Sequence, residues 1–193
     1  MGALRAIAFF FLFIELPVPI YWLIIHPLNS VWRTRVRAAF WTAGLSAWTV
    51  GGSLLWIFRP RLLAVEPPHP AILALGFALL AVELYLFWRV ERELGGRRLV
   101  GLAELTGTGE LNTSGLYGVV RHPRYAGMFC GVLGSAAIAG TPRLWAVVAV
   151  WAALVAAMIA FEDRELTARF GPAYSAYRKR VPAILPRMPR GPR

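Results

Sequence analysis

Five mostly apolar runs alternate along the chain with shorter polar stretches, and this alternation sets the first structural expectation. The runs cover residues 3–25, 38–58, 71–88, 125–140 and 144–161. A helix that crosses a bilayer needs about 20 predominantly apolar residues, with a range of about 17–25. The fourth run is short, but Thr141, Pro142 and Arg143 join it tightly to the fifth. The pattern therefore predicts an all-α integral membrane protein with about five transmembrane helices, of which the last two form a C-terminal helical hairpin.

The composition agrees with a membrane protein. The chain has 193 residues, of which 58% are hydrophobic, and its mean hydropathy is +0.55, which is too apolar for an ordinary soluble domain. No linker divides it, so we expect a single membrane domain over residues 1–193. Within that domain, residues 3–88 hold three helices, and residues 89–193 hold a loop, the hairpin and a polar tail.

The first and third runs each contain a carboxylate. Glu15 lies beside Pro17 and Pro19, which we expect to kink the first helix, and Glu83 interrupts the third run. Ionisable residues inside a membrane segment are expensive and mark functional candidates. Each could face a substrate cavity or pair with a cation inside the bundle. A signal peptide is disfavoured, because prolines follow the first apolar core where a small-residue cleavage site is required.

The basic residues are distributed unevenly. Of the 21 Lys and Arg residues, 17 fall between the first and second runs, between the third and fourth, or after the fifth. Because positive charge concentrates on the cytoplasmic side, the central segment, the tail and a cofactor pocket near them are expected to face the cytoplasm. The same distribution explains most of the net charge of +11, so binding to nucleic acid is not needed to account for it.

Several kinds of site are disfavoured by the residue inventory. Cys130 is the only cysteine and three histidines are present, so we expect neither an internal disulfide nor a Cys/His metal site. The chain also lacks a Gly-x-Gly-x-x-Gly dinucleotide motif.

The long polar segment at residues 91–120 leads into a stretch dense in chemical groups. Gly107, Gly109 and Gly115 permit unusual backbone angles or close approach of a ligand. Loops this long are often functional, although a simple connector uses the same residue types.

Residues 117–125 include several side chains that can bind ions, exchange protons or make aromatic contacts. Arg121 can hold a carboxylate in a fixed fork, and His122 can exchange a proton near neutral pH. Pro123 suits the first turn of a helix, while Tyr117 and Tyr125 offer aromatic faces and hydroxyls. A basic, aromatic belt at the membrane interface has a similar composition, so these residues alone leave both interpretations open.

Glu162 and Asp163 directly follow the last apolar run. Adjacent helical residues point about 100° apart, so at most one of them faces a given pocket. A carboxylate at this depth needs a cation, and for Glu162 the candidates are Arg121, His122 or a ligand ammonium.

An ordered set of motifs resembles the isoprenylcysteine carboxyl methyltransferase and phospholipid methyltransferase group over about residues 94–187. The first element is Gly115-x-Tyr117-x-x-x-Arg121-His122-Pro123-x-Tyr125-x-Gly127, and the second begins at Glu162-Asp163 and continues through Phe170-Gly171-x-x-Tyr174-x-x-Tyr177. The resemblance implies a membrane methyltransferase that uses S-adenosylmethionine, bound in a cytoplasm-facing pocket beside the hairpin. It departs from the usual pattern at Asp163, where the family has a second glutamate.

The resemblance also implies residue roles. Glu162 suits the ammonium of S-adenosylmethionine, Arg121 its carboxylate, and the tyrosines its adenine or sulfonium. His122 is needed as a base only if the methyl acceptor must lose a proton. Arg121, His122 and Glu162 are the catalytic candidates, and Glu15 and Glu83 are candidates to face the substrate. The expected cofactor pocket comprises Gly115, Tyr117, Arg121, His122, Pro123, Tyr125, Glu162 and Asp163.

The acceptor stays open at this point. A lipid or another hydrophobic molecule that enters sideways from the bilayer fits the architecture, and the Ala- and Arg-rich composition suggests a prokaryotic plasma membrane. A membrane sterol or steroid reductase that uses NADPH is the alternative enzyme, although such a site favours Lys or Arg where Glu162 stands. A non-catalytic membrane scaffold is the third class, but its polar residues would lie nearer the bilayer centre.

Overall fold

The computed structural model describes residues 2–63, 68–95 and 110–187, and within these ranges the chain is helical without strands. Each apolar run of the sequence forms helix, as predicted. The elements are α1 (Gly2–Glu15), α2 (Val18–Ile25), α3 (Asn29–Trp32), α4 (Val36–Leu62), α5 (Pro70–Leu94), η1 (Gly115–Gly118), α8 (Pro123–Ala139), α9 (Pro142–Phe170) and α10 (Pro172–Arg180).

The predicted kink near Pro17 is confirmed, because α1 ends at Glu15 and α2 begins at Val18. Among the described residues, three helical segments are long and apolar enough to cross a membrane: Gly2–Ile25, Pro70–Leu94 and Pro142–Phe170. The all-α class is thus confirmed, whereas the count of five spans stays a prediction.

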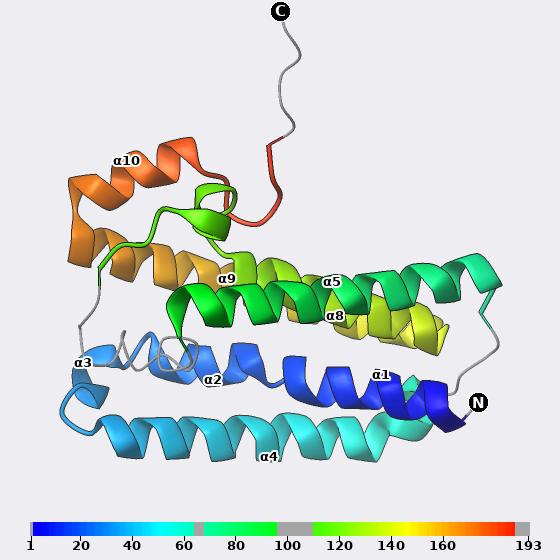
Figure 1. Cartoon of the computed structure of the whole chain (residues 1–193). Coiled ribbons are helices and arrows are strands. Elements are labelled where there is room, and N and C mark those ends of the chain that lie inside the picture. Colours follow the sequence, from blue (N-terminus) through cyan, green and yellow to red (C-terminus); the bar gives the residue numbers. More distant parts are fainter. Residues whose placement is uncertain (1, 64–67, 96–109, 188–193) are drawn as a thin grey trace, which may run out of the picture.

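The long helices lie side by side in a bundle (Figure 1). Its most extensive packing joins α5 to α8, and two glycines allow it. A Cβ atom added at Gly134 would lie 2.8 Å from the carbonyl oxygen of Gly76 on the facing helix. Small residues permit such close packing of helices, and Gly134 provides it on this arm of the hairpin.

The turn between α8 and α9 closes the predicted hairpin. Gly140 ends α8 with φ +68°, a left-handed conformation that favours glycine. Thr141 then donates a hydrogen bond of 2.5 Å to the carbonyl of Leu62, which fixes this turn against the end of α4. At the other end of the bundle, His26 Nδ1 lies 2.9 Å from Glu165 Oε2 and joins the end of α2 to α9.

The C-terminal part folds back over the end of the bundle near α3, where Figure 1 also shows α10. The backbone N–H groups of Arg121 and His122 donate to the carbonyls of Pro182 and Ala183 at 2.8 and 2.9 Å. The Tyr177 hydroxyl donates to the carbonyl of Tyr117 at 2.6 Å. These bonds hold the segment before α8 and the tail together, so the polar motifs at residues 115–125 and 162–182 meet at one place.

Candidate active site

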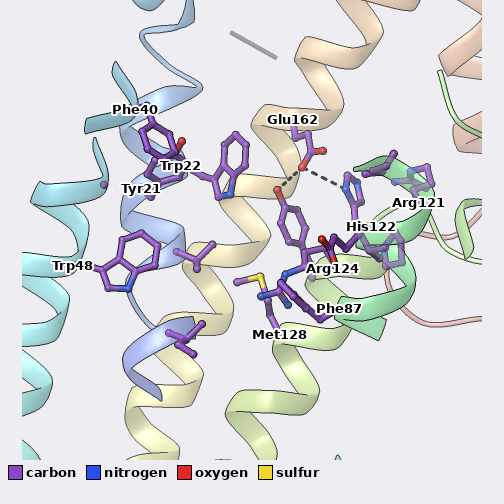
Figure 2. Close-up of a pocket in the computed structure, with 18 of the residues that line it drawn as sticks. Tyr21, Trp22, Phe40, Trp48, Phe87, Arg121, His122, Arg124, Met128 and Glu162 are labelled. Atoms are coloured by element: carbon purple, nitrogen blue, oxygen red, sulfur yellow. Dashed lines mark hydrogen bonds and ion pairs between the residues drawn. The ribbon is translucent and has the colours of Figure 1, made fainter. Parts of the chain in front are cut away.

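A cavity of about 880 Å³ lies where these motifs meet the N-terminal helices. Figure 2 shows its two faces: Tyr21, Trp22, Phe40 and Trp48 project from α2 and α4, and Glu162, His122, Arg121 and Arg124 lie across from them. One part of the cavity is thus aromatic and the other is charged. The remaining lining residues are Ile14, Val18, Trp41, Gly44, Leu45, Thr49, Phe87, Val90, Glu91, Leu94, Tyr117, Pro123, Tyr125 and Met128.

Glu162 supplies a carboxylate to the cavity wall. Its Oε2 accepts a hydrogen bond of 2.5 Å from the Tyr125 hydroxyl and lies 3.5 Å from His122 Nδ1. The rings of His122 and Tyr125 stack with their centroids 5.4 Å apart. The stacked side chains of His122 and Tyr125, at the start of α8, therefore fix the orientation of the Glu162 carboxylate.

Asp163 does not line the cavity, but its carboxylate contacts Arg121 and His122, which do. The residue is 3% exposed, and its carboxylate lies 3.1 Å from His122 Nε2 and 3.0 Å from Arg121. It also accepts a hydrogen bond from Tyr174 and lies 3.4 Å from Nε of Arg178. Burial, together with this carboxylate, holds the pKa of Tyr174 well above its usual range, so the phenol stays a donor. Asp163 thus joins α9 to α8 and α10.

His122 lies between the two acidic residues, with each ring nitrogen facing one carboxylate. Burial alone would lower the pKa of this histidine, but the charge of Glu162 and the hydrogen bonds to both carboxylates outweigh it and raise the pKa to about 9. At neutral pH His122 is therefore an imidazolium, with no free lone pair.

We predict a pH dependence of stability from this ion. A histidine whose pKa is higher in the folded than in the unfolded chain stabilises the fold fully below about pH 6.5, and this contribution is lost as the pH rises through about 9. The size is on the order of 3 kcal/mol. The apparent melting temperature of the detergent-solubilised protein should fall over this range, and the fall should be much smaller in His122→Gln. His69→Gln, which changes an exposed histidine at the start of α5, should keep the wild-type slope; equal slopes in all three proteins would contradict the assignment.

Arg121 lines the cavity, but protein groups hold much of its guanidinium. Besides Asp163, it donates to the carbonyl of Val181 at 2.6 Å and to that of Arg178 at 3.3 Å. Its Nε is buried without a hydrogen-bond partner. The structure therefore gives Arg121 a role in fixing the tail, and its contact with a cofactor carboxylate stays a prediction.

Glu15 and Glu83 come together, although neither is among the residues that line the cavity. Arg124 lies between them and the cavity, with its two terminal nitrogens 2.9 Å from Glu15 Oε1 and 2.6 Å from Glu83 Oε1. Of the two possibilities open from the sequence, pairing inside the bundle is what the structure shows. Their contact with a substrate stays a prediction.

The other predicted cofactor residues divide between the cavity and its surroundings. Tyr117 and Pro123 line the cavity, and Pro123 is the first residue of α8, as expected. Gly115 is not among the lining residues; it has φ +57° and lies against the Glu93 carboxylate. Gly107 and Gly109 fall outside the described residues.

Sequence reasoning missed two parts of this arrangement. The position of Arg124 in the sequence indicates only a basic residue near the membrane boundary, but two carboxylates in membrane segments require a nearby cation, and that requirement points to it. The aromatic wall formed by Tyr21, Trp22, Phe40 and Trp48 had no comparable signal, because aromatic residues in apolar helices are common.

Comparison with known protein families addresses the class of the protein. The family model described as phospholipid methyltransferase matches residues 71–173, a range that contains nearly all of α5, all of α8, the Arg121–Tyr125 motif and the acidic pair. The chain belongs to the phospholipid methyltransferase family. The predicted resemblance to this group of membrane methyltransferases is therefore confirmed.

Relatives of this chain differ in what their names describe. The chain is 38% identical over 73 residues to methanethiol S-methyltransferase 2 of Bradyrhizobium diazoefficiens, covering 38% of this chain and 27% of that protein. It is 37% identical over 82 residues to the protein-S-isoprenylcysteine O-methyltransferase of Schizosaccharomyces pombe, covering 41% and 34%. It is 39% identical over 79 residues to the cobalt-zinc-cadmium resistance protein CzcN of Cupriavidus metallidurans, covering 40% and 36%. The matched segments thus span about a third of these relatives, and no solved structure matches the chain.

Proposed function

We propose that this member of the phospholipid methyltransferase family transfers a methyl group from S-adenosylmethionine to an acceptor that partitions into the membrane. The observation that carries the proposal is the cavity itself, because one continuous cavity joins the Glu162–His122 pair to an aromatic wall. Its volume of about 880 Å³ lies at the upper end of the range of roughly 300–1,000 Å³ for ligand sites. That volume leaves room for a donor and part of an acceptor.

The charged part of the cavity fits the chemical groups of S-adenosylmethionine. When bound, this cofactor supplies an activated methyl group on a sulfonium and also carries an ammonium and a carboxylate. The Glu162 carboxylate lines the wall and can accept a hydrogen bond from the ammonium, and Tyr117 and Tyr125 line the same cavity with aromatic rings, which can contact a cation. Arg121 lines the same cavity and supplies a positive charge for the carboxylate.

The contacts of His122 define its role in this proposal. As an imidazolium between Glu162 and Asp163, it holds the Glu162 carboxylate toward the cavity and has no lone pair with which to remove a proton. Methyl transfer is an in-line displacement whose main requirement is alignment of the two reactants. We therefore assign His122 to positioning and not to general-base catalysis.

The aromatic part of the cavity is the proposed acceptor region. Its residues, Tyr21, Trp22, Phe40 and Trp48, come from α2 and α4 and lie outside residues 71–173, where the family model matches. The names of two relatives refer to a small thiol and to an isoprenylated cysteine, so family membership leaves the acceptor open. An apolar wall provided by the N-terminal helices favours an acceptor with a hydrophobic group.

The proposed orientation places this end of the bundle in the cytoplasm. Arg33, Arg35 and Arg37 surround α3 and the start of α4, and Arg178, Lys179 and Arg180 end α10. Figure 1 shows these elements at the same end of the bundle. Their charge favours the cytoplasmic side of a prokaryotic plasma membrane, where S-adenosylmethionine is made.

Methyl transfer tests this proposal directly. Purified protein in detergent, given S-adenosylmethionine with a labelled methyl group, should transfer label to an acceptor that partitions into an organic phase. The panel contains an isoprenylcysteine analogue, phosphatidylethanolamine and a short-chain thiol. In Trp48→Ala we expect the KM for a hydrophobic acceptor to rise several-fold while cofactor affinity is kept. Transfer only to the water-soluble thiol, unaffected by Trp48→Ala, would contradict the assignment of the aromatic wall.

A further inference from the structure

The group formed by Glu15, Glu83 and Arg124 combines two acidic side chains with one basic side chain. Arg124 from α8 contacts Glu15 from α1 at 2.9 Å and Glu83 from α5 at 2.6 Å. The two acidic residues are 1% and 3% exposed, and both pack against Gly131, where an added Cβ atom would lie 3.6 Å from Glu15 Cγ and 3.3 Å from Glu83 Cγ. One guanidinium therefore faces two buried carboxyl groups.

The second oxygen of each carboxyl group has no partner. Glu15 Oε2 and Glu83 Oε2 are both buried without a hydrogen bond. Gly127 and Gly131 of α8 pack closely against Glu83, so that a Cβ atom at Gly127 would overlap its carboxyl group. An unpaired carboxylate in such a site is strongly destabilised, which means that one further positive charge is needed there.

The surroundings within the described ranges limit what supplies that charge. The titratable groups that interact with the pair are Arg124 and Cys130, both on α8. From α9, Trp151 donates to the backbone carbonyl of Glu15 and not to its carboxyl group. The tight packing at Gly127 favours the smallest cation, a proton.

Arg124 connects this group to the cavity. Its side chain lines the cavity wall next to Phe87, with the guanidinium carbon 5.1 Å from the centre of that ring, and Figure 2 shows it beside Met128 and His122. A positive charge that enters the cavity therefore stabilises the ionised form of the carboxyl pair behind Arg124, because buried charges are screened weakly.

We propose that Glu15 and Glu83 share one proton, and that a cationic ligand in the cavity displaces it. Under the function proposed above, on which this step rests, that ligand is S-adenosylmethionine. The carboxyl O–H bond breaks and the proton passes to the buffer. The positive charge of the sulfonium then replaces the charge of the proton near the two carboxylates. S-Adenosylhomocysteine has the same ammonium and carboxylate without the sulfonium charge, so it should displace much less of the proton.

The first test needs no ligand. Infrared spectra of the full-length protein at neutral pH should show the carbonyl band of a buried protonated carboxylic acid, and Glu83→Gln should remove it. Glu15→Gln serves as a second variant, since either substitution leaves one carboxylate paired with Arg124. If the wild-type protein lacks the band, or if both variants keep it, the shared proton is wrong whatever the enzyme binds.

The second test measures linkage to the cavity. Calorimetric titrations in two buffers of different ionisation enthalpy give the number of protons released on binding. For the wild type we expect greater release with S-adenosylmethionine than with S-adenosylhomocysteine, and loss of this difference in Glu83→Gln. Equal release for both ligands in the wild type, or a difference that persists in both glutamine variants, would overturn the linkage. If the wild type binds neither ligand, the proposed cofactor and the linkage fail together, and the infrared band still decides the shared proton.

Discussion

Asp163→Asn is expected to destabilise the protein by about 3–5 kcal/mol, the usual effect of removing one partner from a buried ion pair. The carboxylate of Asp163 contacts Arg121, His122, Tyr174 and Arg178. Asparagine keeps the shape but loses the charge, so Arg121 and His122 retain buried positive charge with less compensation. The apparent melting temperature in detergent should fall strongly.

The comparison with Glu162 makes this prediction specific. Asp163 does not line the cavity and Glu162 does, so the two adjacent substitutions should separate stability from binding. Asp163→Asn should lower the melting temperature even without any ligand, and Glu162→Gln should lower it less, because the Glu162 side chain is 21% exposed and the Asp163 side chain only 5%. A melting temperature for Asp163→Asn equal to that of the wild type would show that the Asp163 network does not hold the tail to the bundle.

Glu162→Gln is expected to weaken S-adenosylmethionine binding by about 1.5–3 kcal/mol, the scale of a hydrogen bond to a charged group. This corresponds to a rise in Kd of roughly 10- to 150-fold. The reason is that Glu162 presents its carboxylate to the cavity, where Tyr125 and His122 orient it. Calorimetric titration of the variant measures the change.

Glu165→Gln is the matched control. Glu165 lies on the same helix, three residues further on, and contacts His26 at 2.9 Å without lining the cavity. Its substitution should leave the Kd for the cofactor unchanged, while loss of the His26 contact lowers the melting temperature. If both glutamine variants weaken cofactor binding equally, Glu162 has no special role in the pocket.

The helices could be predicted because their apolar runs are long and their boundaries carry strong local signals. Pro17, Pro123 and Pro142 stand at helix breaks or starts, and Gly140 ends α8. The meeting of the Arg121–Tyr125 motif with Glu162 and Asp163 could also be predicted, because α8 and α9 form a hairpin whose open ends must lie together. Helix boundaries depend on local residues, and the meeting of the hairpin ends depends on chain topology, so both can be predicted from the sequence.

The partners of individual charges depended on the packing of helices distant in sequence. Glu15 and Arg124 are 109 residues apart and meet only because α1 packs against α8. Arg121 was expected to bind a cofactor carboxylate, yet its guanidinium also contacts Asp163 and two carbonyls of the chain's end. The rotation of α9 that places Glu162 in the cavity wall and Asp163 outside it follows from tertiary contacts and not from the pattern of residues.

Calorimetric titration of the wild-type protein with S-adenosylhomocysteine, and separately with NADPH, tests the central claim most directly. If the cavity is the cofactor site of a methyltransferase, S-adenosylhomocysteine should bind with one site per chain and NADPH should not bind, because the Glu162 carboxylate repels its phosphates. Binding of NADPH in place of S-adenosylhomocysteine would contradict the account, and so would the absence of binding by S-adenosylhomocysteine.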